Sequence, residues 1–190
     1  MNRPVKPLLL TVMSLLCAVP FVQCSGVDSA ANKKLLEKLG ATSVTVFPTL
    51  VRGTEQHYDT GSAEAIVQFL KAEKLAEAAL AAEQIPVTGE WGMNQSKMYM
   101  ASAKSVGSYV TQHSLSTDYA LMAEYLMGKG EAVGIHCYVV DTQGRLAAGI
   151  QLNSHDKDFA AAEPRTPEDC TKVLLAKLKN ELKKRQGGNP

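Results

Sequence analysis

The chain has little of what usually identifies a chemistry. Its 190 residues include four cysteines, one tryptophan and 6% aromatic residues. They contain no Gly-x-Ser-x-Gly nucleophile elbow, no Gly-x-x-x-x-Gly-Lys phosphate loop and no Cys-x-x-Cys pair. Lys and Arg number 20 against 19 Asp and Glu, so the whole chain lacks the charge excess that binds nucleic acid or an anionic membrane. We therefore predict a protein without enzymatic activity, cofactor or nucleic-acid partner.

Residues 1–26 have the layout of a secretory signal peptide. Arg3 and Lys6 form a short basic start without acids, residues 8–19 are mostly apolar, and Pro20 ends the run. This run is shorter than the roughly 20 apolar residues that a membrane-spanning helix needs, and no later stretch reaches that length. The sequence therefore predicts an exported protein, either periplasmic or secreted.

Two interpretations of the end of this leader are open. Cys24 is either the lipidated cysteine of a bacterial lipoprotein or a residue next to a simple cleavage site, after Cys24 or after Gly26. A lipobox normally has leucine three residues before the cysteine and a small residue directly before it, where this chain has Phe21 and Gln23. A lipid on Cys24 is the one membrane contact we expect.

Cys137 and Cys170 lie beyond the leader. A disulfide between them would close a loop of about 33 residues and stabilise the fold by roughly 3–4 kcal/mol. Both cysteines fall on apolar faces, Cys137 of a strand and Cys170 of the last helix, so both sulfurs are expected in one helix-to-sheet core. A disulfide and two separately buried thiols both fit that placement. His136 falls on the opposite face of the strand and is expected to be exposed.

The periodicity of the remaining chain predicts a single α/β domain. A short helix and linker, residues 27–42, lead to the domain, residues 43–185, and a disordered tail, residues 186–190, follows it. We expect a mixed sheet of about five strands, three of which form an antiparallel meander, with about three helices packed mainly on one face.

Apolar spacing, capping residues and turn signals define the expected elements. The expected helices cover residues 30–39, 62–83, 96–112 and 166–184. The expected strands cover residues 42–48, 84–88, 119–127, 133–140 and 146–153. The expected loops and turns cover residues 52–61, 89–95 and 153–165. Gly107 is expected to weaken the third helix by about 1 kcal/mol relative to alanine.

Four segments, in this order, resemble the TolB amino-terminal-domain-like group, envelope domains related to CsgG-type lipoproteins. They are residues 43–48 (SVTVFP), 55–64 (EQHYDTGSAE), 117–125 (TDYALMAEY) and 139–144 (VVDTQG). The resemblance implies an α/β fold over most of residues 43–185 and a part in envelope assemblies or secretion. These families share no catalytic residues, so the resemblance carries no functional residue over to this chain.

The resemblance and the lack of catalytic motifs predict a non-catalytic envelope protein. We expect it to bind another envelope protein, or a second copy of itself, through its surface or an edge strand. The alternative is an exported domain that binds a small ligand or a metal, or an enzyme, using the loops around His57 and His155.

The candidate residues of this alternative lie in two polar segments. His57 and Asp59 come just before a predicted helix, whose amino terminus would favour an anion. Their other interpretation is an Asx-type turn that leads into the helix. His155 begins the segment HDKD, in which imidazole and carboxylates, both metal-ligand types, lie close together. The loop offers too few rigidly held ligands, so we predict no metal site.

Overall fold

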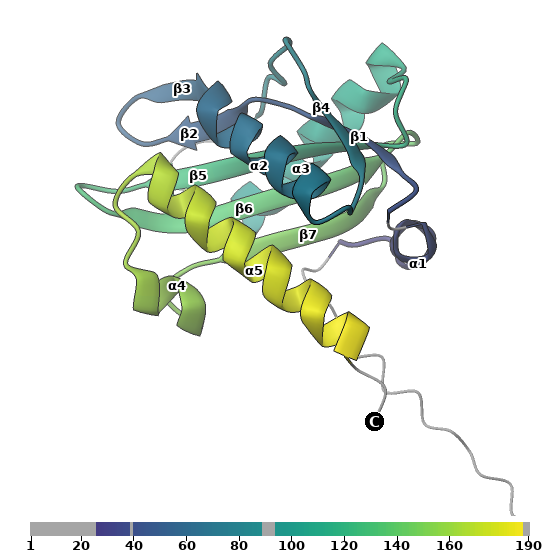
Figure 1. Ribbon diagram of the computed structural model, residues 1–190. Coiled ribbons are helices and arrows are strands. Elements are labelled where there is room, and N and C mark those ends of the chain that lie inside the picture. Colours follow the sequence, from purple (N-terminus) through teal and green to yellow (C-terminus); the bar gives the residue numbers. More distant parts are fainter. Residues whose placement is uncertain (1–25, 39, 89–93, 188–190) are drawn as a thin grey trace, which may run out of the picture.

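The computed structural model describes residues 26–38, 40–88 and 94–187. Across these residues, five helices and seven strands form one α/β domain around a single mixed sheet (Figure 1). The predicted α/β class with a mixed sheet is therefore confirmed. No helix in the described part of the chain is long and apolar enough to cross a membrane. Residues 1–25 of the predicted leader, including Cys24, lie outside the described residues. Its last residue, Gly26, is described.

The predicted antiparallel meander forms one half of the sheet. β5 (Tyr119–Met127), β6 (Ala132–Asp141) and β7 (Leu146–Leu152) follow one another in space as they do in the sequence. Successive side chains of each strand point to opposite faces, and nearly all of them are buried, so both faces of the meander are covered. The register of the first hairpin places Glu124 directly opposite His136.

Four short strands form the other half of the sheet. β1 (Ser43–Val46) and β2 (Thr49–Arg52) both run parallel to β5, β1 along its first residues and β2 along its last. Pro48 lies between them, where it cannot donate a hydrogen bond to the ladder. β4 (Glu77–Leu80) is parallel to β1, and β3 (Gln56–Asp59) is antiparallel to β2. The sheet thus has two strands more than the expected five.

The predicted loop over residues 52–61 is wrong, because β2 and β3 form a hairpin there. All four residues of β3 are at least partly exposed, and the segment lacks the apolar alternation that identified the other strands. Backbone pairing with β2 forms this strand, not a hydrophobic pattern. The predicted loop over residues 153–165 likewise contains α4 (Lys157–Ala162), a short helix capped by Asp156.

The predicted helix over residues 62–83 is too long. α2 (Thr60–Ala72) ends near Lys74, whose φ of 53° is left-handed, and the chain then forms β4. The alanine-rich sequence of β4 favours a helix, but parallel pairing with β1 outweighs that preference. The strand predicted at residues 84–88 is absent from the described structure, because β4 takes that place in the sheet.

The helices form layers on both faces of the sheet. α1 (Ser29–Glu37), α2 and α5 (Pro167–Gly187) pack on one face, and α3 (Gln95–His113) packs on the other (Figure 1). The core is accordingly divided in two by the sheet, with Cys137 on the side of α1, α2 and α5 and Tyr138 on the side of α3. The expectation of helices mainly on one face is therefore confirmed, and α3 covers the opposite face.

Two predicted segments extend beyond the described residues. Residues 89–93 of the predicted turn, which include Trp91, lie outside them. Residues 188–190 of the predicted tail also lie outside, whereas Gln186 and Gly187 belong to α5.

Gly107 marks the closest approach between α3 and the β6–β7 turn. A Cβ at Gly107 would overlap the carbonyl oxygen of Gly144, and a Cβ at Gly144 would lie 2.7 Å from the carbonyl oxygen of Gly107. Gly144 also has a left-handed φ of 75°, which favours glycine. The two glycines therefore let the helix backbone and the turn backbone touch.

Candidate functional site

The structure gives Asp59 the role of a helix cap. Its carboxylate accepts hydrogen bonds from the Gly61 N–H at 2.9 Å and the Ser62 hydroxyl at 2.5 Å, at the N-cap of α2. His57 lies in the edge strand β3 with an exposed side chain. This is the Asx-type turn that the sequence offered as the other interpretation of the two residues.

The segment around His155 is held by capping and by one lysine of α5. His155 is exposed, and Asp156 caps α4 while its Oδ2 lies 2.8 Å from Lys177 Nζ. Lys177 Nζ also lies 3.6 Å from Asp158 Oδ2. Burial opposes ionisation of Asp156, but its hydrogen bonds and the Lys177 charge keep its pKa below the usual value. Across the described ranges, no three His, Cys, Asp or Glu side chains are grouped to hold a metal.

Cys137 and Cys170 are buried free thiols in the structure. Both belong to the core on the side of α1, α2 and α5, as their apolar faces predicted. Of the two alternatives offered by the sequence, the structure therefore has the separate thiols and not the disulfide. Burial raises the pKa of each thiol to about 12.

We expect neither cysteine to react with iodoacetamide in the folded protein at pH 8, because the reactive thiolate is scarce when the pKa is about 12. Both should react fully in denaturant without a reductant. Peptide mass analysis after alkylation measures this at each site. A chain whose Cys137 and Cys170 stay unmodified in denaturant until a reductant is added would instead contain the disulfide.

A cluster of buried polar side chains lies in the core beneath α3, and the sequence did not predict it. We call this group of side chains, which comes from four elements, the Glu124 cluster. Its members are Arg52, Ser102, Glu124, His136 and Tyr138. Arg52 is 3% exposed and the other four are fully buried. The prediction that His136 is exposed is wrong, because the face opposite Cys137 is covered by α3.

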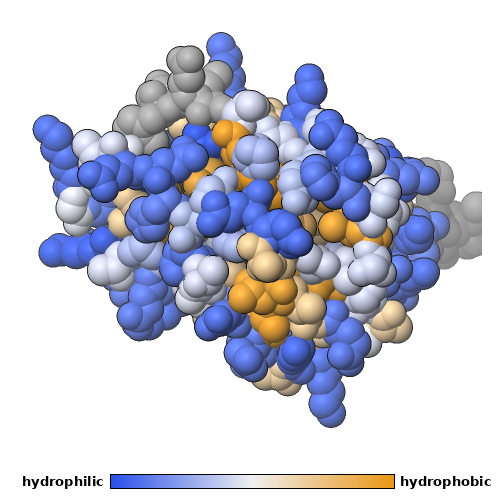
Figure 2. All heavy atoms as spheres, turned by 90° about the horizontal axis from the view of Figure 1, so that it is seen from above, coloured by the Kyte–Doolittle hydropathy of each residue, from blue (hydrophilic) through white to orange (hydrophobic). Residues whose placement is uncertain are grey.

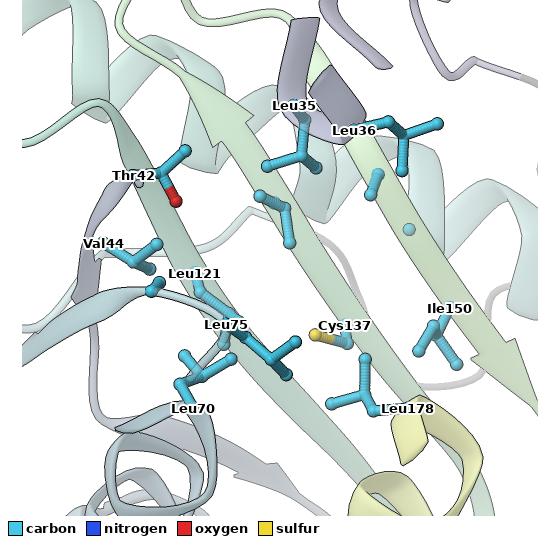
Figure 3. Close-up of a pocket in the computed structure, with 14 residues that line it drawn as sticks. Leu35, Leu36, Thr42, Val44, Leu70, Leu75, Leu121, Cys137, Ile150 and Leu178 are labelled. Atoms are coloured by element: carbon cyan, nitrogen blue, oxygen red, sulfur yellow. The ribbon is translucent and has the colours of Figure 1, made fainter. Parts of the chain in front are cut away.

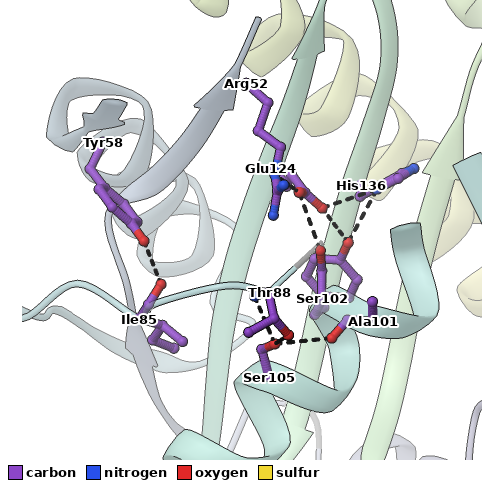
Figure 4. A network of polar contacts seen from close by, with 10 residues as sticks. Arg52, Tyr58, Ile85, Thr88, Ala101, Ser102, Ser105, Glu124 and His136 are labelled. Carbon is purple, nitrogen blue, oxygen red and sulfur yellow. Dashed lines mark hydrogen bonds and ion pairs between the residues drawn. The ribbon is translucent and has the colours of Figure 1, made fainter. Parts of the chain in front are cut away.

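Glu124 is the centre of this cluster (Figure 4). Its Oε1 accepts a hydrogen bond from the Ser102 hydroxyl at 3.2 Å and lies 2.5 Å from Arg52 Nε in an ion pair. Its Oε2 accepts the Tyr138 hydroxyl at 2.5 Å and lies 3.1 Å from His136 Nδ1. Both oxygens of the carboxylate are therefore occupied twice, as a buried charge requires.

This geometry assigns the proton on the imidazole. A carboxylate can only accept, so Nδ1 of His136 must carry the hydrogen, and in the neutral ring Nε2 has a lone pair. Nε2 is buried and has no hydrogen-bond partner in the described part of the chain. The ring of Tyr99 covers His136 edge to face, with ring centroids 5.3 Å apart. A carboxylate-held imidazole is an arrangement of general bases, but here it is sealed in the core.

The cluster shifts the ionisation of its acids. Burial alone would raise the pKa of Glu124, but its hydrogen bonds from His136 and Tyr138, helped by the Arg52 charge, bring the pKa below its usual value. Burial and the neighbouring carboxylate raise the pKa of Tyr138 well above its usual value. Glu124 is therefore a buried anion that ties β2, β5, β6 and α3 together.

An apolar pocket opens on the other face of the sheet, between α1, α2 and α5 (Figure 3). Its cavity volume is about 90 Å³. Six leucines supply much of its wall: Leu35, Leu36, Leu70, Leu75, Leu121 and Leu178. Elsewhere, on the face seen in Figure 2, hydrophobic side chains reach the surface in small patches between hydrophilic ones.

Two side chains bring polar atoms to the wall of this pocket. They are Thr42 and Cys137, whose sulfur points into the cavity in Figure 3. The Thr42 hydroxyl is buried and has no hydrogen-bond partner within the ranges that the structure describes. The pocket thus combines an apolar wall with one polar group that an occupant could satisfy.

No protein-family model matches the chain, and no curated protein matches it. The resemblance to the TolB amino-terminal-domain-like group therefore stays a hypothesis that depends on the four segments alone. The geometry of the apolar pocket is what bears on function.

Proposed function

We propose that the protein is an exported, non-catalytic component of the cell envelope that binds another envelope protein. In this proposal the apolar pocket between α1, α2 and α5 receives one aliphatic side chain of the partner. The single observation that supports it is a preformed apolar cavity that is open at the surface of the helix layer. Pockets that bury one anchor side chain are typical of the energetic centres of protein interfaces.

The size of the pocket favours an anchor side chain over a free ligand. Its cavity of about 90 Å³ is smaller than the 300–1,000 Å³ typical of sites for drug-sized molecules. A cavity of this size suits a group of the size of a leucine or isoleucine side chain. Such a group is too small to bind tightly alone, but it contributes strongly as part of a larger interface.

The charges beside the pocket indicate which charges the partner carries next to its anchor side chain. Three exposed lysines directly adjoin lining leucines: Lys34 next to Leu35, Lys71 next to Leu70, and Lys74 next to Leu75. Two exposed acids adjoin the lining in the same way, Glu37, which is paired with Lys33, and Glu77. None of the three lysines forms an ion pair with another described residue, whereas Lys179 of α5 is paired with Glu73. An aliphatic residue with acidic neighbours would therefore match this surface in both shape and charge.

We expect a photo-crosslinking amino acid at Leu36, which is half-buried at the pocket, to give one major adduct with an envelope protein in the native cell. Filling the pocket with Ala76→Leu should reduce the yield of this adduct at least tenfold, because the anchor side chain loses its space. The matched control is Leu80→Lys on β4, a 36% exposed leucine outside the pocket, which should leave the yield unchanged.

Three results would contradict this proposal or redirect it. An adduct of equal yield with Ala76→Leu would place the contact outside the pocket. An adduct between two copies of the purified chain would make the partner a second copy of the protein. Native mass spectrometry that finds a small apolar molecule bound to the purified chain, and lost in Ala76→Leu, would favour the small-ligand alternative.

A further inference from the structure

The outer face of α3 combines positive charge with an exposed apolar side chain. Its exposed stripe is formed by residues three or four apart, which are Lys97, Met100, Lys104, Ser108 and Thr111. The helix has no Asp or Glu in its 19 residues, although acids and bases are nearly equal in number in the whole chain. Met100, in the middle of the basic half of this stripe, is 39% exposed.

The chain enters the domain against this face. A Cβ added to Gly26 would lie 2.5 Å from Met100 Cε and 2.8 Å from its Sδ, so the backbone of Gly26 is in contact with Met100. Gly26, Met100 and Lys104 line one hollow of about 590 Å³. Cys24 precedes Gly26 by two residues, which span at most about 7 Å. A lipid on Cys24 would therefore hold the membrane surface close to α3.

We propose that the outer face of α3 lies on an anionic phospholipid surface, with Lys97 and Lys104 at the headgroups and Met100 at the boundary to the acyl chains. Neither lysine forms an ion pair with another described residue, so both charges are available to phosphates. Arg145 also lines the hollow, but Asp141 holds it at 2.6 Å, and its charge is compensated. Lysines at a membrane surface keep their ammonium groups among the headgroups while their stems contact apolar material.

Near-neutral charge of the whole chain does not oppose this arrangement. Electrostatic attraction to a membrane falls off within about 10 Å in salt, so only the charges on the facing surface count. Asp28 lines the hollow with Lys104, and its carboxylate caps α1 by accepting the Ala31 N–H at 2.7 Å. Glu37, Glu64 and Glu168 lie on α1, α2 and α5, on the other face of the sheet. The apolar pocket is on that side as well, so a domain resting on α3 would leave the pocket open to a partner.

The test measures binding of the full exported chain to vesicles. We expect it to bind vesicles of phosphatidylglycerol and phosphatidylethanolamine more tightly than vesicles of phosphatidylcholine. Replacing both lysines, Lys97→Gln and Lys104→Gln, should weaken binding to the anionic vesicles by about 25-fold, at about fivefold per lysine. The matched control, Lys172→Gln with Lys179→Gln on α5, should change it less than twofold.

A second readout locates the contact on the molecule. An environment-sensitive dye on Ser108→Cys should shift to shorter wavelength on anionic vesicles, while the same dye on Lys172→Cys should not. Equal binding by the α3 double variant and the parent chain, or a dye shift at position 172 alone, would overturn the proposal. Neither outcome depends on the partner that the pocket binds, so this proposal and the proposed function fail separately.

Discussion

Glu124→Gln is expected to lower the free energy of unfolding by about 3–5 kcal/mol. The substitution keeps the shape of the side chain but removes the charge that faces the Arg52 guanidinium in the core. Removing one member of a buried ion pair costs this much because the remaining charge stays desolvated. Urea unfolding of the purified exported chain, followed by circular dichroism, measures the change.

The effect should depend on pH in a defined direction. The pKa of Glu124 is lowered in the folded protein, so its ionised form stabilises the fold above its unfolded pKa of about 4.3. This stabilisation is lost as the pH falls below that value, through the folded pKa. The difference in unfolding free energy between the parent and Glu124→Gln should therefore shrink as the pH falls below about 5 and through the folded pKa. A difference that stays constant over this range would show that the charge of Glu124 is not what stabilises the cluster.

Two further variants distinguish the effect of losing the Arg52–Glu124 ion pair from the effect of removing any carboxylate. Glu64→Gln changes an exposed acid of α2 and should alter the free energy of unfolding by less than about 0.5 kcal/mol. Arg52→Met in the Glu124→Gln background should cost less than it does alone, because the two side chains interact directly. Additive effects of the two substitutions would contradict the ion pair as the source of the stabilisation.

The elements that the sequence predicted correctly are those with a clear local signal. β5, β6 and β7 are mostly apolar runs of seven to ten residues separated by glycine-containing turns, and α5 begins with the capping residue, proline and acids that mark a helix start. The predictions for the segments of β3 and β4 were wrong for opposite reasons. β3 is polar and forms through its backbone pairing, and β4 is alanine-rich and forms a strand because β1 is beside it. The strand that pairs with each of them cannot be identified from the local sequence.

The Glu124 cluster was partly accessible to the same reasoning. Glu124 and His136 are polar residues inside two otherwise apolar strands, and the short Gly128–Gly130 turn sets them opposite each other. A charged residue within a buried strand usually has a buried partner, so this pair could have been found from the hairpin register. Arg52 and Ser102 could not have been found in this way, because they reach the cluster from β2 and α3 through contacts between distant segments. The apolar pocket depends on three helices and was not predictable for the same reason.

Gly107→Ala is expected to destabilise the protein, although helix propensity alone predicts the opposite. Alanine at this position would gain about 1 kcal/mol from propensity. Its Cβ, however, would overlap the carbonyl oxygen of Gly144, which belongs to the backbone and cannot rotate away as a side chain does. Forcing α3 away from the β6–β7 turn would also disturb the core beneath the helix, where overpacking costs about 1–3 kcal/mol or more. We expect a net loss of about 2 kcal/mol in the free energy of unfolding.

Ser108→Ala is the matched control, since it changes the next residue of the same helix on its exposed side. It should leave the free energy of unfolding within about 0.5 kcal/mol of the parent, or raise it slightly, because propensity acts there without a steric clash. Thermal or urea unfolding of both variants measures the sign of each change in the free energy of unfolding. If Gly107→Ala were as stable as Ser108→Ala, the close contact between α3 and the β6–β7 turn would not exist in solution. The opposite signs expected for two neighbouring residues follow from one backbone contact, which tertiary structure alone creates.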